Sequence, residues 1–195
     1  MPTEQRTPLS LRLVGEQVLV RPPRPNDLPE LRALMRANQE HLRPFSPAKP
    51  VGSSGMSLVE LSRSIAHERR QWRRDRAYVL LIAALEPDEP LVGRVALTEV
   101  ARGPFQNALL GYWVTEQRQA RGIATEAVRL AVELAFARLG LHRLQAAVMP
   151  KNLASRRVLE KLGFREEGVG RRYLQIAGRW EDHVLYALTR EEWKP

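Results

Sequence analysis

The residues best suited to do chemistry in this chain form a short run at positions 119–125, Gln-Ala-Arg-Gly-Ile-Ala-Thr. The run lies between an apolar, strand-like stretch at 108–114 and a long pattern of helical periodicity. A glycine-containing turn that opens a helix exposes unpaired backbone N–H groups at the positive end of the helix dipole. Such a turn is suited to bind phosphate or pyrophosphate. We therefore expect a phosphate-bearing ligand here.

The run alone does not identify that ligand. Gly122 and Ala124 are small enough to let a ligand reach the backbone. No Gly-Lys-Ser/Thr follows, so the run is not a Walker A loop, and the three-glycine pattern of dinucleotide-binding turns is absent. A turn glycine without any ligand is the competing interpretation. Other parts of the chain must narrow the choice.

The elements that position this run belong to a chain of ordinary globular composition. The 195 residues are 44% hydrophobic and 27% charged, which predicts a single domain over 1–195 with residues 1–10 flexible. The lack of cysteine excludes disulfides, thiolate metal sites and a covalent thioester on the enzyme. No stretch is apolar enough to span a bilayer, and residues 1–10 lack the apolar core of a signal peptide. We expect a cytoplasmic protein.

The net charge of +9 is carried almost entirely by arginine. A basic balance fits nucleic acid, an acidic partner or a polyphosphate cofactor. Several arginines cluster at 69–74. A solvated helix face explains this cluster better than a nucleic-acid-binding patch, because no nucleic-acid-binding motif accompanies it. We expect neither nucleic acid nor a membrane among the partners, and no metal, because the histidines lack metal-ligand spacing.

The apolar pattern predicts an α+β (mixed α/β) domain built on one central mixed sheet with flanking helices. Two capping boxes, Asp27 with Glu30 and Ser57 with Glu60, are expected to start the first two helices, and Leu58 is expected to face inward. A loop at 43–56, rich in proline and glycine, separates these helices and has the length of a lid or binding loop. Further helices are expected at 125–139 and 152–162, and strands at 18–21, 78–85, 91–100, 108–114, 142–149, 165–176 and 181–188.

Three further segments narrow the choice of ligand for this run. Gly-Tyr-Trp at 111–113 precedes the run, Asn-Leu-Ala-Ser at 152–155 follows the next strand, and Glu-Lys-Leu-Gly-Phe at 160–164 ends the helix after it. With the run and the Thr-Glu-Ala at 125–127, they resemble the GNAT superfamily of acyl-CoA-dependent N-acetyltransferases. The closest resemblance is to its RimJ/RimL branch, which acetylates protein N-termini. The resemblance extends over nearly the whole chain, and the joint order and spacing are far more specific than any single segment.

The resemblance implies a GNAT fold with splayed central strands and acetyl-CoA as cosubstrate. It implies that backbone N–H groups of the run hold the pyrophosphate, and that Arg121 adds a charge able to pair with phosphate. The pantetheine arm would lie between strands at 112–114 and 144–149, bonded as an added strand. The implied cofactor-binding residues are Trp113, Val114, Gln119, Ala120, Arg121, Gly122, Ile123, Ala124, Thr125, Asn152 and Ser155.

Two catalytic candidates follow. In the RimL-like pattern, the serine at Ser155 is proposed to protonate the departing thiolate, and the tyrosine that other members place three residues later is Val158 here. Since a thiol has a pKa of about 8.5, strong acid help is not required, and Ser155 is equally a common helix-start residue. Glu99, near the end of a central strand, is the candidate general base, acting through water. A solvent-facing strand glutamate is its competing interpretation.

We therefore expect an enzyme that transfers an acetyl group from acetyl-CoA to a primary amine by direct attack in a ternary complex. The preferred acceptor is a protein N-terminal α-amine, entering from the side of the loop at 43–56, with a backbone N–H near Val114 holding the oxyanion. The cluster at 180–183, which includes His183, either lines the acceptor site or forms a hairpin rim. Two alternatives stay open: a small-molecule amine such as an antibiotic, polyamine or amino acid derivative, and a CoA-binding module without turnover. A homodimer is also left open.

Overall fold

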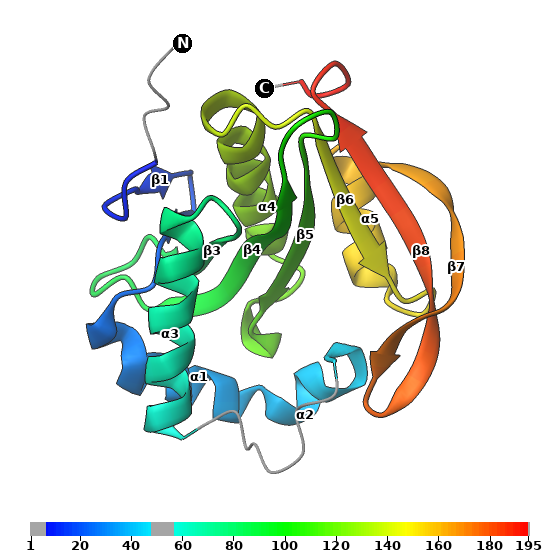
Figure 1. Cartoon of the computed structure of the whole chain (residues 1–195). Helices are drawn as coiled ribbons and strands as arrows, with labels where there is room; N and C mark the ends of the chain where they lie inside the picture. The colour runs from blue at the N-terminus through cyan, green and yellow to red at the C-terminus, as the bar shows by residue number, and fades with distance from the viewer. Residues whose placement is uncertain (1–6, 48–56, 195) are drawn as a thin grey trace.

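The computed structural model describes residues 7–47 and 57–194. In this part of the chain the strands form one eight-stranded sheet in the order β1-β2-β3-β4-β5-β6-β8-β7 (Figure 1). Neighbouring strands are antiparallel except β5 and β6, which run parallel. The strands are β1 (Leu13–Val14), β2 (Val18–Arg21), β3 (Tyr78–Ala84), β4 (Leu91–Ala101), β5 (Asn107–Val114), β6 (Arg143–Val148), β7 (Arg165–Ile176) and β8 (Arg179–Thr189).

Helices cover both faces of this sheet (Figure 1). The α-helices are α1 (Leu28–Ala37), α2 (Gln39–Leu42), α3 (Leu58–Arg73), α4 (Ile123–Glu133) and α5 (Leu153–Lys161), with short 3₁₀ turns at Pro25–Asp27, Arg43–Phe45 and Glu116–Arg118. Buried residues of α4 and α5 form the main core cluster with β3–β6 and β8. A smaller cluster joins α1 and α3 to β2 and β3. The predicted α+β class with one mixed sheet is confirmed.

The sheet core agrees closely with the apolar pattern. β3 is buried along its whole length, as its unbroken apolar sequence predicts for a central strand covered on both faces. The Ser57 capping box is confirmed: Ser57 Oγ accepts from the Glu60 N–H at 3.2 Å, and Glu60 Oε2 accepts from the Ser57 N–H at 3.1 Å. Gly140 and Gly163 take the left-handed conformation after the helices that they end, with φ of 64° and 82°.

The expected capping box at the first helix is wrong. The helix does begin at Leu28, but the Asp27 side chain makes no cap hydrogen bond there. Its carboxylate instead accepts hydrogen bonds from both terminal nitrogens of buried Arg21, at 2.7 and 2.8 Å. It also accepts one from the Arg24 N–H at 2.6 Å. Glu30 does not reach back either, because its Oε1 accepts from the Leu91 N–H at 2.6 Å. A buried guanidinium requires a carboxylate, and this requirement outweighs local capping.

Three further details differ from the expectations. Leu58 is 46% exposed rather than inward, because it occupies the first position of α3. The helix expected at 125–139 is α-helical only to Glu133 and continues as a π-helical turn at Leu134–Arg138. The very short strand β1 was not expected, and the single helical face expected from Leu28 to Leu42 is divided at Asn38 into α1 and α2. Most of the loop expected at 43–56 lies outside the described residues. Its expected role as a lid or binding loop therefore stays a prediction.

Candidate active site

The central strands β5 and β6 separate part of the way along the sheet. They pair only from Asn107 to Leu109, opposite Arg143 to Gln145, although both strands continue. Their outer edges stay paired: β4 follows β5 up to Val114, and β8 follows β6 up to Val148. Each strand therefore has one unpaired edge that faces the gap, and Figure 1 shows the two diverging towards α2.

Alternation along β5 directs particular backbone groups to this gap. The Thr115 N–H donates to the Val92 carbonyl on β4 at 2.8 Å. Successive residues of a strand point their N–H groups to opposite edges, so the N–H of Val114 points to the gap. An extended ligand in the gap can bond to such groups as an added strand would.

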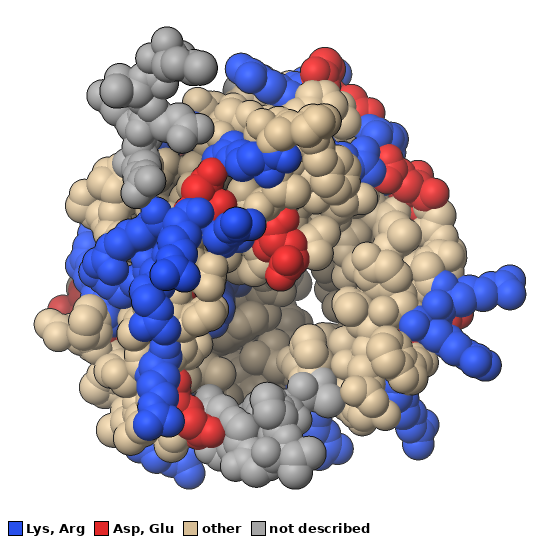
Figure 2. Space-filling view, in the orientation of Figure 1, with Lys and Arg blue, Asp and Glu red and all other residues tan. Residues whose placement is uncertain are grey.

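A cavity of about 490 Å³ occupies the gap, and Figure 2 shows the molecule hollowed there. Of the predicted site residues, Trp113, Asn152 and Ser155 line it. Its other lining residues are Leu42, Phe45, Ser46, Pro47, Thr98, Leu109, Leu110, Gly111, Tyr112, Gln145, Ala146, Ala147, Val148, Met149, Tyr173, Leu174, Ile176, His183, Leu185 and Tyr186.

The predicted phosphate turn follows β5 directly. Ala120 and Gly122 have positive φ, 56° and 82°, and α4 begins at Ile123. Within the described residues, the backbone N–H groups at 120–125 donate to no protein acceptor, and the first N–H of α4 that is bonded belongs to Glu126. This turn therefore presents a row of free donors, as the sequence predicts.

Conformation, rather than space, requires the glycine in this turn. A Cβ built on Gly122 would lie 3.5 Å from Gln17 Nε2, an ordinary contact distance, but its φ of 82° is one that other residues rarely adopt. Arg121 is exposed. Gln119 is engaged outside the turn, since its Nε2 lies 2.6 Å from the Nε2 of His41 on α2.

A buried carboxylate that sequence reasoning passed over supports the start of α4. Glu126 is 8% exposed and accepts the backbone N–H groups of Glu16 and Gln17, in the turn between β1 and β2. A Cβ on Gly15 would overlap this carboxylate, so the turn needs a glycine there. Only the three-dimensional structure reveals this role, because Gln17 and Glu126 are more than a hundred residues apart in sequence.

Asn152 and Ser155 lie together at the start of α5. Asn152 Oδ1 accepts from the Ser155 N–H at 3.2 Å, which confirms Asn152 as the N-cap. Ser155 Oγ lies 2.8 Å from the hydroxyl of Tyr112 on β5, and that hydroxyl also donates to the Ser155 carbonyl at 3.0 Å. Burial raises the pKa of Tyr112 to about 12, so the phenol is protonated at neutral pH. The two hydroxyls form a hydrogen-bonded pair, and both residues line the cavity.

Glu99 lies at a β-bulge in β4, with a φ of 49°, where the register with β5 shifts between Thr98 and Ala101. Its side chain is exposed. Thr98 beside it lines the cavity, whereas Glu99 does not. The structure therefore places this candidate base next to the cavity wall rather than within it.

The part of the cavity beyond the gap is formed by β7, β8 and the segment after α2. Pro47 forms a bridge to Ile176, and the Ala177 N–H donates to the Ser46 carbonyl at 3.3 Å, so this segment meets the hairpin tip. None of the described residues that line the cavity is Asp, Glu, Lys or Arg. His183, whose role the sequence left open, is 3% exposed and lines it from β8.

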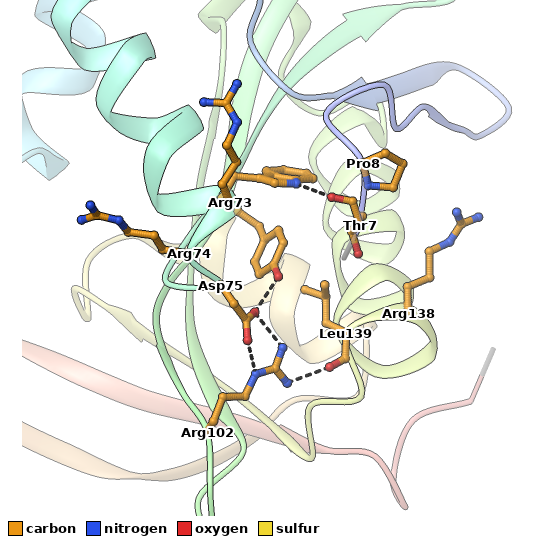
Figure 3. A pocket seen from close by; sticks show the side chains of 10 residues that line it. Thr7, Pro8, Arg73, Arg74, Asp75, Arg102, Arg138 and Leu139 are labelled. Carbon is orange, nitrogen blue, oxygen red and sulfur yellow. Dashed lines mark hydrogen bonds and ion pairs between the residues drawn. The ribbon is translucent and has the colours of Figure 1, made fainter. Parts of the chain in front are cut away.

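A larger cavity, about 770 Å³, lies near the other end of β5, beside the end of α3 (Figure 3). Its wall is held by Asp75, which pairs with Arg102 at 2.6 and 2.7 Å and accepts from the Tyr78 hydroxyl at 2.5 Å. Figure 3 shows Arg73 and Arg74 directed away from this pair. Both are exposed, which agrees with the solvated helix face expected for this run.

Split parallel strands beside a free-donor turn define the acetyl-CoA-dependent N-acetyltransferases of the GNAT fold. The chain belongs to this class: the sequence model of the acetyltransferase (GNAT) domain family matches residues 17–165. Within the described residues no helix could cross a membrane, and no cluster of three or more His, Cys, Asp or Glu side chains could hold a metal ion.

The chain is similar over most of its length to several bacterial proteins. It is 38% identical over 181 residues to the probable N-acetyltransferase YjcK of Bacillus subtilis (92% of this chain, 98% of that one). It is 30% identical over 186 residues to the ribosomal protein uS5-alanine N-acetyltransferase of Escherichia coli (95% and 94%). The structure of Mycobacterium smegmatis RimJ in complex with CoA-disulfide matches it with a TM-score of 0.84 and 35% identity (90% and 83%). The RimJ/RimL resemblance is confirmed.

Proposed function

We propose that this protein acetylates the N-terminal α-amine of a protein, with acetyl-CoA as donor. The observation that carries the proposal is the cavity at the split between β5 and β6, whose described lining holds no Asp, Glu, Lys or Arg. The free donors at 120–125 suit the pyrophosphate, and Arg121 adds an exposed positive charge. The gap suits the pantetheine arm, whose amides can bond to the edge of β5.

The lining of the cavity supports an α-amine as acceptor. An amine must lose its proton before it attacks, and an α-amine, with a pKa near 8, does so far more easily than a lysine side chain near 10.4. A polyamine or an aminoglycoside would also bring further cationic groups into the site. No described carboxylate lines the cavity to pair with them, and an unpaired buried charge is costly. An N-terminal residue with an uncharged side chain suits this lining.

Relatives support the same acceptor class. One is named for the alanine of ribosomal protein uS5, and the neighbour of known structure is named RimJ and holds a CoA-disulfide. The first covers 95% of this chain and the second 90%. A ribosomal protein is therefore the first acceptor to test. Such an acceptor agrees with the cytoplasmic location expected from the sequence, and that location stays a prediction, as does a homodimer.

The proposed reaction is direct attack of the neutral amine on the thioester carbonyl. The N–H of Val114 points to the gap and is the candidate donor to the oxyanion. As the carbon–sulfur bond breaks, Ser155 gives its hydroxyl proton to the sulfur, and the proton is replaced through the adjacent Tyr112 hydroxyl. Glu99 at the bulge and His183 within the cavity are the two groups that can accept the amine's proton.

The test is thiol release from acetyl-CoA by the purified protein with a panel of acceptors. The panel contains peptides with each of the twenty residues at a free N-terminus, a polyamine and an aminoglycoside. We expect release with a subset of the peptides only. Release with the polyamine or the aminoglycoside alone would place the protein among small-molecule acetyltransferases. Binding of acetyl-CoA with no release for any amine would favour a CoA-binding module.

A further inference from the structure

His183 is a buried histidine whose ring is oriented by the backbone. Its Nδ1 lies 3.0 Å from the carbonyl oxygen of Glu181. A carbonyl oxygen only accepts, so Nδ1 carries the hydrogen, and in the neutral ring Nε2 then holds the free lone pair. Within the described residues Nε2 has no hydrogen-bond partner, and it is not sealed from solvent. The residue lines the cavity, and Nε2 is the ring atom with which it can accept a proton.

The other titratable groups that line this cavity are poor proton acceptors. They are the three tyrosines Tyr112, Tyr173 and Tyr186. Burial raises the pKa of Tyr112 to about 12 and also raises the pKa of Tyr186, so both phenols keep their protons at neutral pH. Histidine is the side-chain type that changes its charge near neutral pH. Among the described lining residues, His183 alone is of that type.

We propose that His183 is the catalytic base that takes the proton from the acceptor's ammonium group, a role that rests on the proposed function. One proton moves from the ammonium nitrogen to Nε2, and the neutral amine attacks the thioester carbonyl. The second proton passes from the nitrogen to water as the carbon–sulfur bond breaks. Ser155 gives its hydroxyl proton to the sulfur and regains one from water through the Tyr112 hydroxyl. The products are the acetylated amine and the thiol of CoA. The imidazolium then returns its proton to water.

Two acidic residues of its own strand and one aromatic ring neighbour His183. On its own strand, Glu181 and Asp182 precede it, and the Asp182 carboxylate accepts from the Arg172 N–H of β7 at 2.7 Å. From β7, the ring of Tyr173 lies 5.8 Å away and the residue directly opposite is Gly170. The cavity lining from β5, β6 and the segment after α2 brings no charged side chain towards it.

Two substitutions separate a catalytic from a structural role. His183→Asn keeps an N–H able to bond to the Glu181 carbonyl but has no basic nitrogen. His183→Gln places an amide nearer the position of Nε2 and also has no basic nitrogen. If His183 is the base, both variants should lose about 10²-fold or more in kcat at neutral pH, and the KM for acetyl-CoA should be unchanged. A structural role predicts that His183→Asn behaves nearly as wild type.

The dependence of kcat/KM for the acceptor on pH gives the second readout. A general base acts only in its unprotonated form, so the wild-type profile should fall on the acidic side. In both variants the amine must lose its proton to water, so activity should rise steadily up to the amine's own pKa near 8. The defect should therefore shrink as the pH is raised.

The matched control is His142→Gln, which removes an exposed histidine paired with Glu191 outside the cavity, and its rates should be those of wild type. The proposal is overturned if His183→Asn retains wild-type kcat and the acidic limb, or if Glu99→Gln removes that limb while His183→Asn keeps it. If the wild type itself releases no thiol with any amine, it is the proposed function that fails.

Discussion

At the scale of single residues, the proposed chemistry depends on a few side chains that separate elements bring together. Ser155 comes from α5 and Tyr112 from β5, and their hydroxyls lie 2.8 Å apart. The family resemblance singles out Ser155 through the Asn-Leu-Ala-Ser motif, and the Asn152 cap on the Ser155 N–H confirms the helix start there. It gives no indication of Tyr112 as a partner, because a contact across 43 residues depends on how the helix packs on the sheet.

Ser155→Ala should lower kcat by about a hundredfold, the lower end of the range for acid catalysis, because a thiolate is already a good leaving group. Steady-state kinetics with acetyl-CoA varied should show an unchanged KM. Ser64→Ala, on the exposed face of α3, is the control. An unchanged kcat in Ser155→Ala would leave Ser155 as a helix-start residue only.

Gly122→Trp should weaken acetyl-CoA binding at least about tenfold, since losing even one charge-assisted hydrogen bond has that effect. Isothermal titration calorimetry measures it directly. Gly103→Trp is the matched control, because Gly103 also has positive φ, 71°, but lies in the turn between β4 and β5 with open space around it. Equal affinities of the two variants for acetyl-CoA would rule out the assignment of this turn as the pyrophosphate site.

At the scale of elements, the site depends on strands that part and on turns that are tied in place. β5 and β6 separate after Leu109 while their outer edges stay paired, so the gap is a property of the sheet. Glu126 ties the β1–β2 turn to the start of α4, and Asn38 Oδ1 accepts the Glu116 N–H at 2.9 Å to tie α1 to the segment after β5. These ties fix the phosphate turn relative to the gap.

The buried pair of Arg21 and Asp27 supports the stability of this arrangement. Each side chain is 8% exposed. Asp27→Asn should cost about 3–5 kcal/mol of unfolding free energy, because it leaves a buried guanidinium without its carboxylate. Urea denaturation measures this loss. Glu89→Gln breaks an exposed pair with Arg12 and should barely shift the urea midpoint. Equal shifts for the two variants would contradict the role given to burial.

Acid should weaken the same pair. Burial alone would raise the pKa of Asp27, but the hydrogen bonds from Arg21 and the Arg24 N–H, with their charges, outweigh it and lower the pKa. The carboxylate therefore stabilises the fold above the ordinary aspartate pKa of about 3.9, and that stability is lost as the pH falls through the lowered value. Urea midpoints measured between pH 6 and about pH 2 should fall in wild type and less in Asp27→Asn. Parallel curves would contradict this.

At the scale of the whole molecule, periodicity predicted most of the sheet and its helices, because β3 and α4 bury surfaces that apolar spacing reveals directly. The expectations that are wrong concern Asp27, Glu30 and Leu58, where a distant partner or a place at a helix end decides the outcome. The phosphate turn was predictable because its donors are local in sequence. The uncharged acceptor side was not, since it is assembled from β5–β8 and the segment after α2.

The central claim, acetyl transfer to a protein N-terminal α-amine, is tested most directly by placing both kinds of amine in one molecule. A peptide panel carries each of the twenty residues at a free N-terminus and one lysine further along. After incubation with acetyl-CoA and the protein, fragmentation mass spectrometry locates the acetyl group. We predict that it lies on the α-nitrogen in every peptide that reacts. Acetyl groups found on the lysine side chain, with the α-nitrogen free, would contradict the account.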